Sequence, residues 1–339
     1  MTDRQNKLLN RLDYHIQSCF LCDLHKNGRA KPYWNENIKY GIIAEAPGKR
    51  ETEQNTPLCG PAGTNFFNIL SEYNLKRENF LIINSVNCRP VVNNKNGKPT
   101  PEQSNICSGW IRKYLKVSNV NNILLLGDYA IKSIENQLKI DLMIDNSVIR
   151  TSGVSYRKNF FGKELRFVCG VHPAWATIYN IEKGKTYINN FIIELIKPDI
   201  KKFRGKYGFL SNFHESPIVW KNEKYTTAEH AFQAAKAETE KERSMIQSAN
   251  SPSEAKKMGN KIKLRHDWNN IKNSIMTEIL KIKFESDQLK KQLKNTGTVL
   301  LEEGNTWHDN YWGVCNCGSC SNGQNNLGKI LMNIRDKIV

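Results

Sequence analysis

The segment IKYGIIAEAPGKR, residues 38–50, decides the fold of the first half of the chain. Its apolar residues predict a buried strand over residues 38–46, and Pro47 and Gly48 predict the turn that ends it. Glu45 therefore lies at the carboxyl end of this strand. In α/β domains the functional residues gather at the carboxyl ends of the strands, so this carboxylate is a candidate site residue.

Strands and helices alternate through the rest of this half. FLIINSVN (80–87), NNILLL (121–126) and RFVCGVH (166–172) predict further strands, and helices are predicted at 64–75, 101–117 and 185–196. This alternation predicts a three-layer αβα sandwich with a mainly parallel sheet. Asn84 and His172 also fall at or near strand carboxyl ends, so we expect them to share one site with Glu45.

The pattern changes after KPDIKKFRGKYG, residues 197–208, which is typical of a charged linker. Three long runs at 227–249, 251–263 and 273–296 have apolar residues every three to four positions and predict helices, the second with Ser251 and Pro252 at its start. We therefore expect a first domain over residues 1–198, a linker over 199–206 and a mainly helical domain over 207–339.

Composition narrows the class of protein. The 339 residues suffice for two domains, and no apolar run reaches the ~18–20 residues that cross a bilayer. The first residues lack the apolar core of a signal peptide, so we expect no membrane association and a cytoplasmic location, in a bacterium or a phage-infected host cell. The net charge of +17 favours a polyanionic partner such as DNA, although the Lys- and Asn-rich bias of an AT-rich genome also contributes.

Four of the nine cysteines form a ligand pattern. Cys19 and Cys22 stand in the pair CFLC, and Cys88 and Cys107 follow far along the chain. A C-x-x-C pair with distant partners is typical of a metal or iron–sulfur site that attaches a chain end to a folded core. Two further cysteines lie in apolar or strand contexts and are expected to be unligated: Cys59 and Cys169.

A second group of cysteines lies in CNCGSC, residues 315–320. Cys315, Cys317 and Cys320 suit a metal knuckle, for which His308 is the obvious fourth ligand, because a closed zinc site needs four. The alternative is a flexible surface loop without metal. The sequence leaves both open.

Together the CFLC pair, the AEAPG loop (44–48), INSVNCRP (83–90) and HPAW (172–175) resemble the iron–sulfur uracil-DNA glycosylases of family 4. The resemblance implies a 4Fe-4S cluster on the four cysteines named above. It also implies that Glu45 acts near the scissile sugar–base bond, that Asn84 reads a pyrimidine edge, and that His172 stabilises negative charge on the departing base.

One position departs from that family. TPLCGPAG, residues 56–63, has Leu58 where the family has an aromatic residue that stacks on uracil. Losing the flat ring weakens stacking on a base by about 1–3 kcal/mol. Leu58 is therefore expected to line the base-binding site, and the preferred base need not be uracil.

The second half resembles the NADAR family, also called YbiA-like, in YGFLSNFHESPI (207–218), YTTAEHAFQAAK (225–236), DNYWGVC (309–315) and GQNNLGKILMNIR (323–335). Members cleave N-glycosidic bonds of ribosylated bases, including a phosphoribosylaminopyrimidine and ADP-ribosylated guanine, also in DNA. The resemblance implies Glu229 as the catalytic carboxylate and Asp309 opposite it. It places four substrate-binding residues around them: Asn212, Gln233, Lys236 and Trp312. Glu229, Gln233 and Lys236 also share one face of a helix at i, i+4 and i+7.

Two functions follow. The first is a hydrolase of N-glycosyl bonds with two sites, one excising uracil or a modified base from DNA and one removing ADP-ribose from guanine on DNA. The second is an altered glycosylase-like module that binds DNA, fused to a small-molecule N-glycosidase for phosphoribosylated pyrimidines or NAD-derived metabolites. If both sites act on the same DNA molecule, the fusion has an advantage, because tethering raises the effective concentration of the second site near the first.

Overall fold

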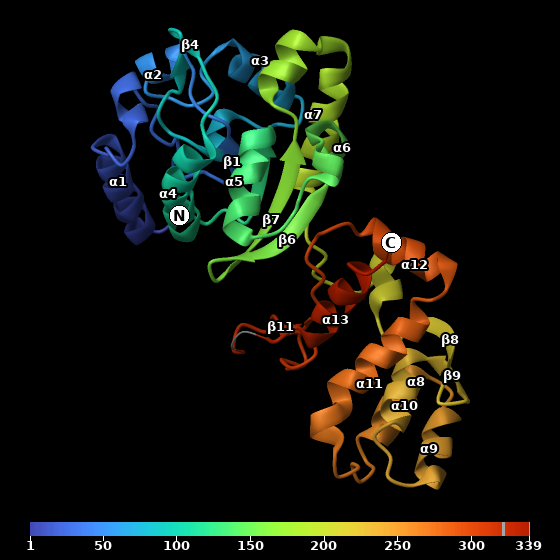
Figure 1. Ribbon diagram of the computed structural model, residues 1–339. Helices are drawn as coiled ribbons and strands as arrows, with labels where there is room; N and C mark the ends of the chain where they lie inside the picture. The colour runs from blue at the N-terminus through green and yellow to red at the C-terminus, as the bar shows by residue number, and fades with distance from the viewer. Residues whose placement is uncertain (321–322, 339) are drawn as a thin grey trace. The chain divides into compact units, whose positions relative to one another are not determined.

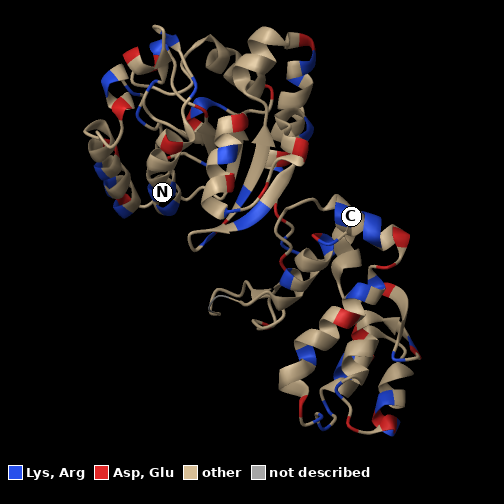
Figure 2. Ribbon diagram, viewed as in Figure 1, with Lys and Arg blue, Asp and Glu red and all other residues tan. Residues whose placement is uncertain are grey.

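The computed structural model describes residues 1–320 and 323–338. The chain divides into two compact units, Met1–Lys197 and Pro198–Val339 (Figure 1). No helix among the described residues is long and apolar enough to cross a membrane. Lys and Arg lie on helices of both units, interleaved with Asp and Glu (Figure 2).

A five-stranded sheet organises the first unit. Its spatial order is β2 (Phe80–Asn84), β1 (Tyr40–Ala44), β5 (Asn122–Leu126), β7 (Lys163–Gly170) and β6 (Ser155–Phe160). The first four strands are parallel, and only β6 runs antiparallel to its neighbour in this sheet. The predicted mainly parallel sheet is confirmed.

Alternate residues of the four parallel strands belong to two separate cores, one on each face of the sheet. Ile43 and Leu125 pack with residues of α1 (Asp3–Gln17), α4 (Pro101–Val117) and α5 (Asp128–Leu138). Ile42 and Leu124 pack with residues of α3 (Pro61–Ser71) and α7 (Ile181–Ile196). Because side chains alternate between faces along a strand, helices cover both faces, and the predicted αβα sandwich is confirmed.

Helix α4 occupies the predicted span, residues 101–117. Thr100 caps it by accepting a hydrogen bond from the Gln103 N–H, and Pro101 takes the first turn. The sequence pattern did not anticipate α1 or the edge strand β6. Short elements of this unit include α2 (Lys49–Glu53), α6 (Val148–Thr151) and the hairpin of β3 (Val91–Val92) and β4 (Lys95–Asn96).

The second unit is mainly helical around a single core, as expected. A hairpin of β8 (Glu215–Trp220) and β9 (Glu223–Thr227) leads into α8 (Ala228–Ala234). The two-residue strands β10 (Gly304–Asn305) and β11 (Val314–Cys315) pair in parallel. The remaining helices are α9 (Glu240–Gln247), α10 (Pro252–Gly259), α11 (Trp268–Lys283), α12 (Asp287–Asn295) and α13 (Asn326–Arg335).

Two of the three predicted helical runs are divided. The run 227–249 breaks between α8 and α9, because Thr239 caps a new helix and forms a capping box with Glu242. The run 273–296 breaks between α11 and α12. The run 251–263 begins as predicted, since Ser251 caps α10 and Pro252 follows, but the helix ends at Gly259.

Candidate active sites

The three predicted residues of the first unit lie at one edge of the sheet. Asn84 ends β2, Glu45 follows β1, and His172 lies two residues beyond β7. Ala44 pairs in register with Asn84, and Leu126 of β5 pairs with Gly170. The strands are adjacent and parallel, so their carboxyl ends meet at this edge.

Asn84 presents an amide with unused hydrogen-bonding capacity. Its side chain is 1% exposed, and its Nδ2 has no partner within the described part of the chain. The backbone beside it is fixed, because the Ser85 N–H donates to the Ala44 carbonyl at 2.7 Å and the Val86 N–H donates to the Glu45 carbonyl at 3.2 Å. A buried donor without a partner costs about 1–3 kcal/mol, so a ligand that accepts this hydrogen bond gains affinity.

His172 is held as a neutral imidazole. Burial lowers its pKa to about 4. Its Nδ1 accepts a hydrogen bond from the Ala174 N–H at 3.2 Å, so the proton of the neutral ring is on Nε2. A side chain at Gly127 would come within 3.1 Å of the His172 Cβ, and Gly127 has φ +92°. The backbone conformation and the close approach of the imidazole therefore both favour glycine at position 127.

Glu45 and Leu58 differ in their surroundings. Burial raises the pKa of Glu45, Lys98 lowers it, and Asp128 raises it further. Asp128, the first residue of α5, also lies close to Glu45, and no motif marks it in the sequence. Leu58 is 7% exposed, packs in the core beneath α3 and has φ +53°. Its backbone is fixed at both ends, since its N–H donates to Glu51 and its carbonyl accepts from Arg77.

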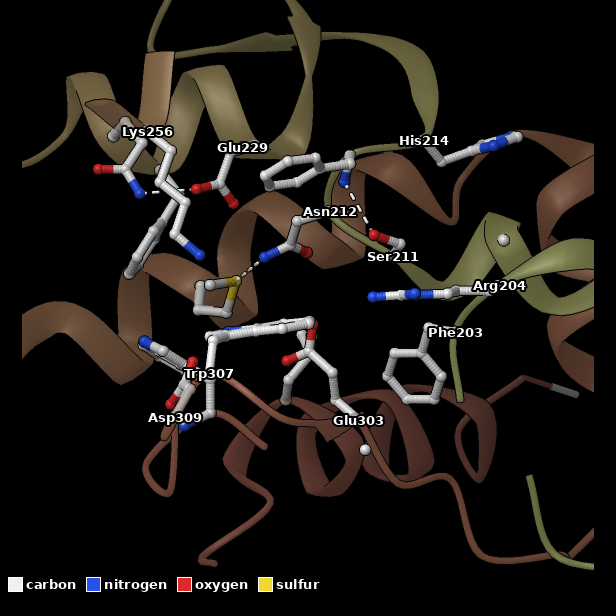
Figure 3. Close-up of a pocket in the computed structure, with 18 of the residues that line it drawn as sticks. Phe203, Arg204, Ser211, Asn212, His214, Glu229, Lys256, Glu303, Trp307 and Asp309 are labelled. Atoms are coloured by element: carbon white, nitrogen blue, oxygen red, sulfur yellow. Dashed lines mark hydrogen bonds between the residues drawn. The ribbon is translucent and has the colours of Figure 1, made fainter. Parts of the chain in front are cut away.

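The second unit contains a cavity of about 1000 Å³. Figure 3 shows Glu229 on one side of it and Asp309 and Glu303 on the other. Aromatic side chains line it alongside charged ones. All six residues predicted for the second site contribute to its walls: Asn212, Glu229, Gln233, Lys236, Asp309 and Trp312.

Helix α8 positions Glu229. The helix starts at the end of β9, where the Thr227 hydroxyl accepts from the His230 N–H and lies 2.8 Å from the His230 Nδ1. Gln233, one turn on from Glu229, donates to the Glu229 Oε1 at 2.7 Å. Burial raises the pKa of Glu229, whereas Gln233 and the nearby lysines lower it. Lys236 lies two residues beyond the end of α8 and still lines the cavity.

The opposite wall is a loop built around Asp309. Its Oδ1 accepts hydrogen bonds from the N–H groups of Tyr311 and Trp312, at 3.1 and 2.9 Å. The Asn305 side chain fixes the backbone of Asp309, because it donates to the Asp309 carbonyl and accepts from the Asp309 N–H. The Trp312 ring packs edge-on against Phe232 of α8, 5.3 Å between centroids. The carboxylate is therefore held in one orientation.

Comparison with known proteins gives the family of each unit. Residues 31–196 match the Uracil DNA glycosylase superfamily, and residues 200–339 match the NADAR domain. The chain is 31% identical over 178 residues to a type-4 uracil-DNA glycosylase of Archaeoglobus fulgidus, covering 52% of this chain and 86% of that protein. It is 37% identical over 135 residues to the N-glycosidase YbiA of Escherichia coli, covering 39% and 82%. The chain belongs to both families.

The fusion predicted from the motifs is thereby confirmed. The relatives of both domains are named glycosylases or N-glycosidases, so the chain is a hydrolase of N-glycosyl bonds. An NMR structure of the Escherichia coli protein YbiA is 34% identical, covers 42% of this chain and 88% of that chain, and has a TM-score of 0.37.

In the glycosylase domain, the four predicted ligand cysteines share one neighbourhood. Burial and, to a smaller extent, the charges of the other three thiols raise the pKa of Cys107 to about 12. Burial raises the pKa of Cys88 to about 11, and Arg29 lowers it. The Asn87 N–H donates to the Cys107 sulfur, and the Arg29 guanidinium donates to the Cys19 carbonyl at 2.7 Å.

These surroundings fit an anionic iron–sulfur cluster. An amide donor and a guanidinium stabilise sulfur ligands that are thiolates. The four thiols therefore suit the iron–sulfur cluster that the resemblance to family 4 implies.

The NADAR cavity also contains charged residues that the sequence analysis missed. Glu303 lies just before β10, and burial together with the nearby Asp309 raises its pKa to about 7. Arg204 and Lys256 add positive charge, and Trp307 adds an aromatic face. Glu303, Arg204 and Trp307 stand in segments without helical or strand periodicity, so no repeating pattern marks them. Lys256 was not predicted either, because the sequence is rich in lysine and nothing distinguishes this lysine from the others.

Proposed function

We propose that this chain is a two-site DNA base-processing enzyme. Its glycosylase domain excises uracil or a modified base, and its NADAR domain removes ADP-ribose from guanine on DNA. The observation that carries the second assignment is a cavity of about 1000 Å³ that combines three carboxylates with three cations. Small-molecule sites span about 300–1,000 Å³, so this volume is at the upper end of their range.

The NADAR cavity suits an ADP-ribosyl group by charge and shape. Arg204, Lys236 and Lys256 offer cations to a diphosphate, and Trp307 and Trp312 offer flat faces to a base. The guanidinium of Arg204 lies 5.7 Å from the centre of the Trp307 ring, so cation and aromatic face are adjacent. A ligand that carries both a phosphate and a base can therefore contact the guanidinium and the aromatic ring at the same time.

The carboxylates can divide the work of hydrolysis. Breaking an N-glycosidic bond leaves a positively charged, oxocarbenium-like sugar and a base that must receive a proton. We assign Glu229 to the sugar side, because Gln233 donates a hydrogen bond to its Oε1 and two lysines, Lys236 and Lys256, oppose the rise in its pKa that burial causes. We assign Glu303 to the departing base, because its pKa of about 7 leaves a substantial protonated fraction at neutral pH. Asp309, fixed by two backbone amides, contacts the substrate from the same wall.

The edge of the glycosylase sheet suits excision of a flipped-out base. The unpaired amide of Asn84 can hydrogen-bond a pyrimidine edge. The neutral His172 offers its Nε2–H to the oxygen on which negative charge develops. Glu45 is left to face the cationic sugar or to position water. The target base must leave the duplex to reach this edge, because its reacting bond is inaccessible inside the stack.

Cys19, Cys22, Cys88 and Cys107 would hold the 4Fe-4S cluster of the glycosylase domain. Glycosidic cleavage transfers no electrons, so the cluster's contribution is structural. It would attach the segment after α1 to the two buried thiols of the core. No chemical step depends on it.

The test is release of ADP-ribose from DNA that carries ADP-ribosylated guanine, followed by mass spectrometry. Glu229→Gln should abolish release, because it removes the charge and hardly changes the volume. The control is Glu240→Gln, an exposed glutamate of α9, which should retain the wild-type rate. A wild-type rate in Glu229→Gln would remove the assignment. Activity on a free phosphoribosylaminopyrimidine without any on ADP-ribosylated DNA would instead favour the small-molecule N-glycosidase.

A further inference from the structure

A cluster of one imidazole and three thiols lies in the NADAR domain beside the proposed active site. The Nδ1 of His308 is 3.2 Å from the Sγ of Cys320. It is 3.5 Å from the Sγ of Cys317 and 3.8 Å from the Sγ of Cys315. All four ligand atoms lie within 4.8 Å of one another.

These distances are those of a tetrahedral coordination shell. With zinc–sulfur bonds of 2.3 Å and zinc–nitrogen bonds of 2.0–2.1 Å, tetrahedral geometry puts nitrogen and sulfur ligands about 3.6 Å apart and two sulfurs about 3.8 Å apart. The three observed nitrogen–sulfur distances bracket the first value. The four side chains therefore already surround a space the size of one ion.

The backbone around the cluster supports metal ligation. The Ser319 N–H donates to the Cys317 sulfur, and the Asn310 side chain donates to the Cys320 sulfur. Such donors stabilise thiolate ligands. Gly318 has φ +83°, which permits the tight turn between the last two cysteines. His308 has φ +67°, a left-handed conformation that costs a non-glycine residue about 1–2 kcal/mol and requires a compensating interaction.

We infer that His308, Cys315, Cys317 and Cys320 form a closed, four-coordinate site for a zinc-like divalent ion. Three thiolates and one imidazole are a ligand set typical of structural zinc. Four protein ligands leave no open position for water or substrate, so the ion takes no part in hydrolysis. The inference does not depend on which N-glycosidic bond the cavity cleaves.

The site would fix one wall of the cavity. His308 stands between Trp307 and Asp309, and both line the cavity. Cys315 pairs with Asn305 of β10, two residues after Glu303. An ion bound to His308 and Cys315 therefore joins the segment that carries Glu303 and Asp309 to the loop that follows β11. Loss of the ion should loosen this wall and leave the helical core in place.

The test is elemental analysis of the full chain, purified anaerobically with a reductant, with zinc and iron counted separately. We expect about one zinc per chain. Cys317→Ser and His308→Ala should each lower zinc content at least fivefold and keep the iron. Cys88→Ser should lose iron and keep zinc, which separates this site from the cluster of the glycosylase domain. The control is Cys59→Ser, which also removes one half-buried thiol and should change neither metal.

X-ray absorption at the zinc edge of the wild type keeps the inference testable if the variants do not fold. Three sulfurs at about 2.3 Å and one nitrogen at about 2.0–2.1 Å are expected. A zinc shell of oxygen and nitrogen alone would show adventitious metal and overturn the inference. It would also be overturned by a zinc-free wild type, by zinc retained in both ligand variants, or by a disulfide among the three cysteines in place of the metal.

Discussion

Substituting Glu303 by glutamine tests the proposed division of labour in the NADAR cavity. Burial raises the pKa of Glu303 to about 7 from an ordinary value of 4.5. If the protonated carboxyl donates a proton to the departing base, kcat/KM for ADP-ribose release should fall about tenfold per pH unit above pH 7. Glu303→Gln should lower kcat/KM at pH 6 by about 10²- to 10⁴-fold, the usual contribution of a general acid, and should abolish the alkaline decline.

The same substitution should change stability with a sign set by the pKa shift. Because the folded pKa lies above the unfolded one, the folded state retains a proton that the unfolded state loses between pH 4.5 and 7. Stability therefore falls as pH rises through this window and levels off above pH 7. The shift corresponds to about 3 kcal/mol. Glutamine does not ionise, so the free energy of unfolding of Glu303→Gln, taken relative to that of the wild type, should be higher by about that much at pH 8 than at pH 5.

Two assays check these expectations. Initial rates from pH 5 to 9 give the activity profile, and urea unfolding of the full chain at pH 5 and pH 8 gives the stability difference. Glu302→Gln is the matched control, because Glu302 is the neighbouring residue and does not line the cavity. An alkaline decline that persists unchanged in Glu303→Gln would refute the acid assignment. An equal stability difference in both variants would refute the burial argument.

Three further outcomes concern the glycosylase domain. His172→Ala should lower base excision by about 10²- to 10³-fold, the effect of removing one oxyanion-type donor, as measured by base release from a defined DNA. Cys88→Ala should bleach the brown colour of a cluster-containing protein, and a colourless, iron-free wild type would contradict the ligand assignment. Leu58→Phe should raise excision of uracil relative to other bases. The larger ring should also cost about 1–3 kcal/mol in stability, because Leu58 packs in the core.

The local features predicted from the sequence are those with a short-range physical cause. Helix α4 has its cap and first-turn proline within a few residues of each other, and the structure follows the predicted span. Each predicted buried strand is an apolar run that ends at turn residues, and the structure contains these strands in its five-stranded sheet. The helix spacing of Glu229 and Gln233 is also local, and the two side chains hydrogen-bond as neighbours one turn apart.

The features that the pattern missed have two causes: a competing local helix cap, and tertiary context. The run 227–249 has helical spacing throughout. However, Thr239 is more stable as the N-cap of a helix than inside one, so a new helix begins there. Glu303 and Arg204 are about 100 residues apart and reach the same cavity only after folding. The pKa of Glu303 likewise arises from burial and from nearby charges, neither of which a single-sequence pattern contains.

In both proposed active sites, burial keeps one titratable side chain in its neutral form. Burial disfavours the charged form of any titratable group, so it lowers the pKa of a histidine and raises that of a carboxylic acid. At His172 this yields a neutral imidazole with its proton on Nε2, and at Glu303 it yields a carboxyl that retains its proton near pH 7. Each neutral group is a hydrogen-bond donor. Cleavage of an N-glycosidic bond leaves electron density on the departing base, so a buried donor near that base stabilises the product side of the reaction. We therefore propose that both domains use desolvation to place a neutral hydrogen-bond donor at the departing base.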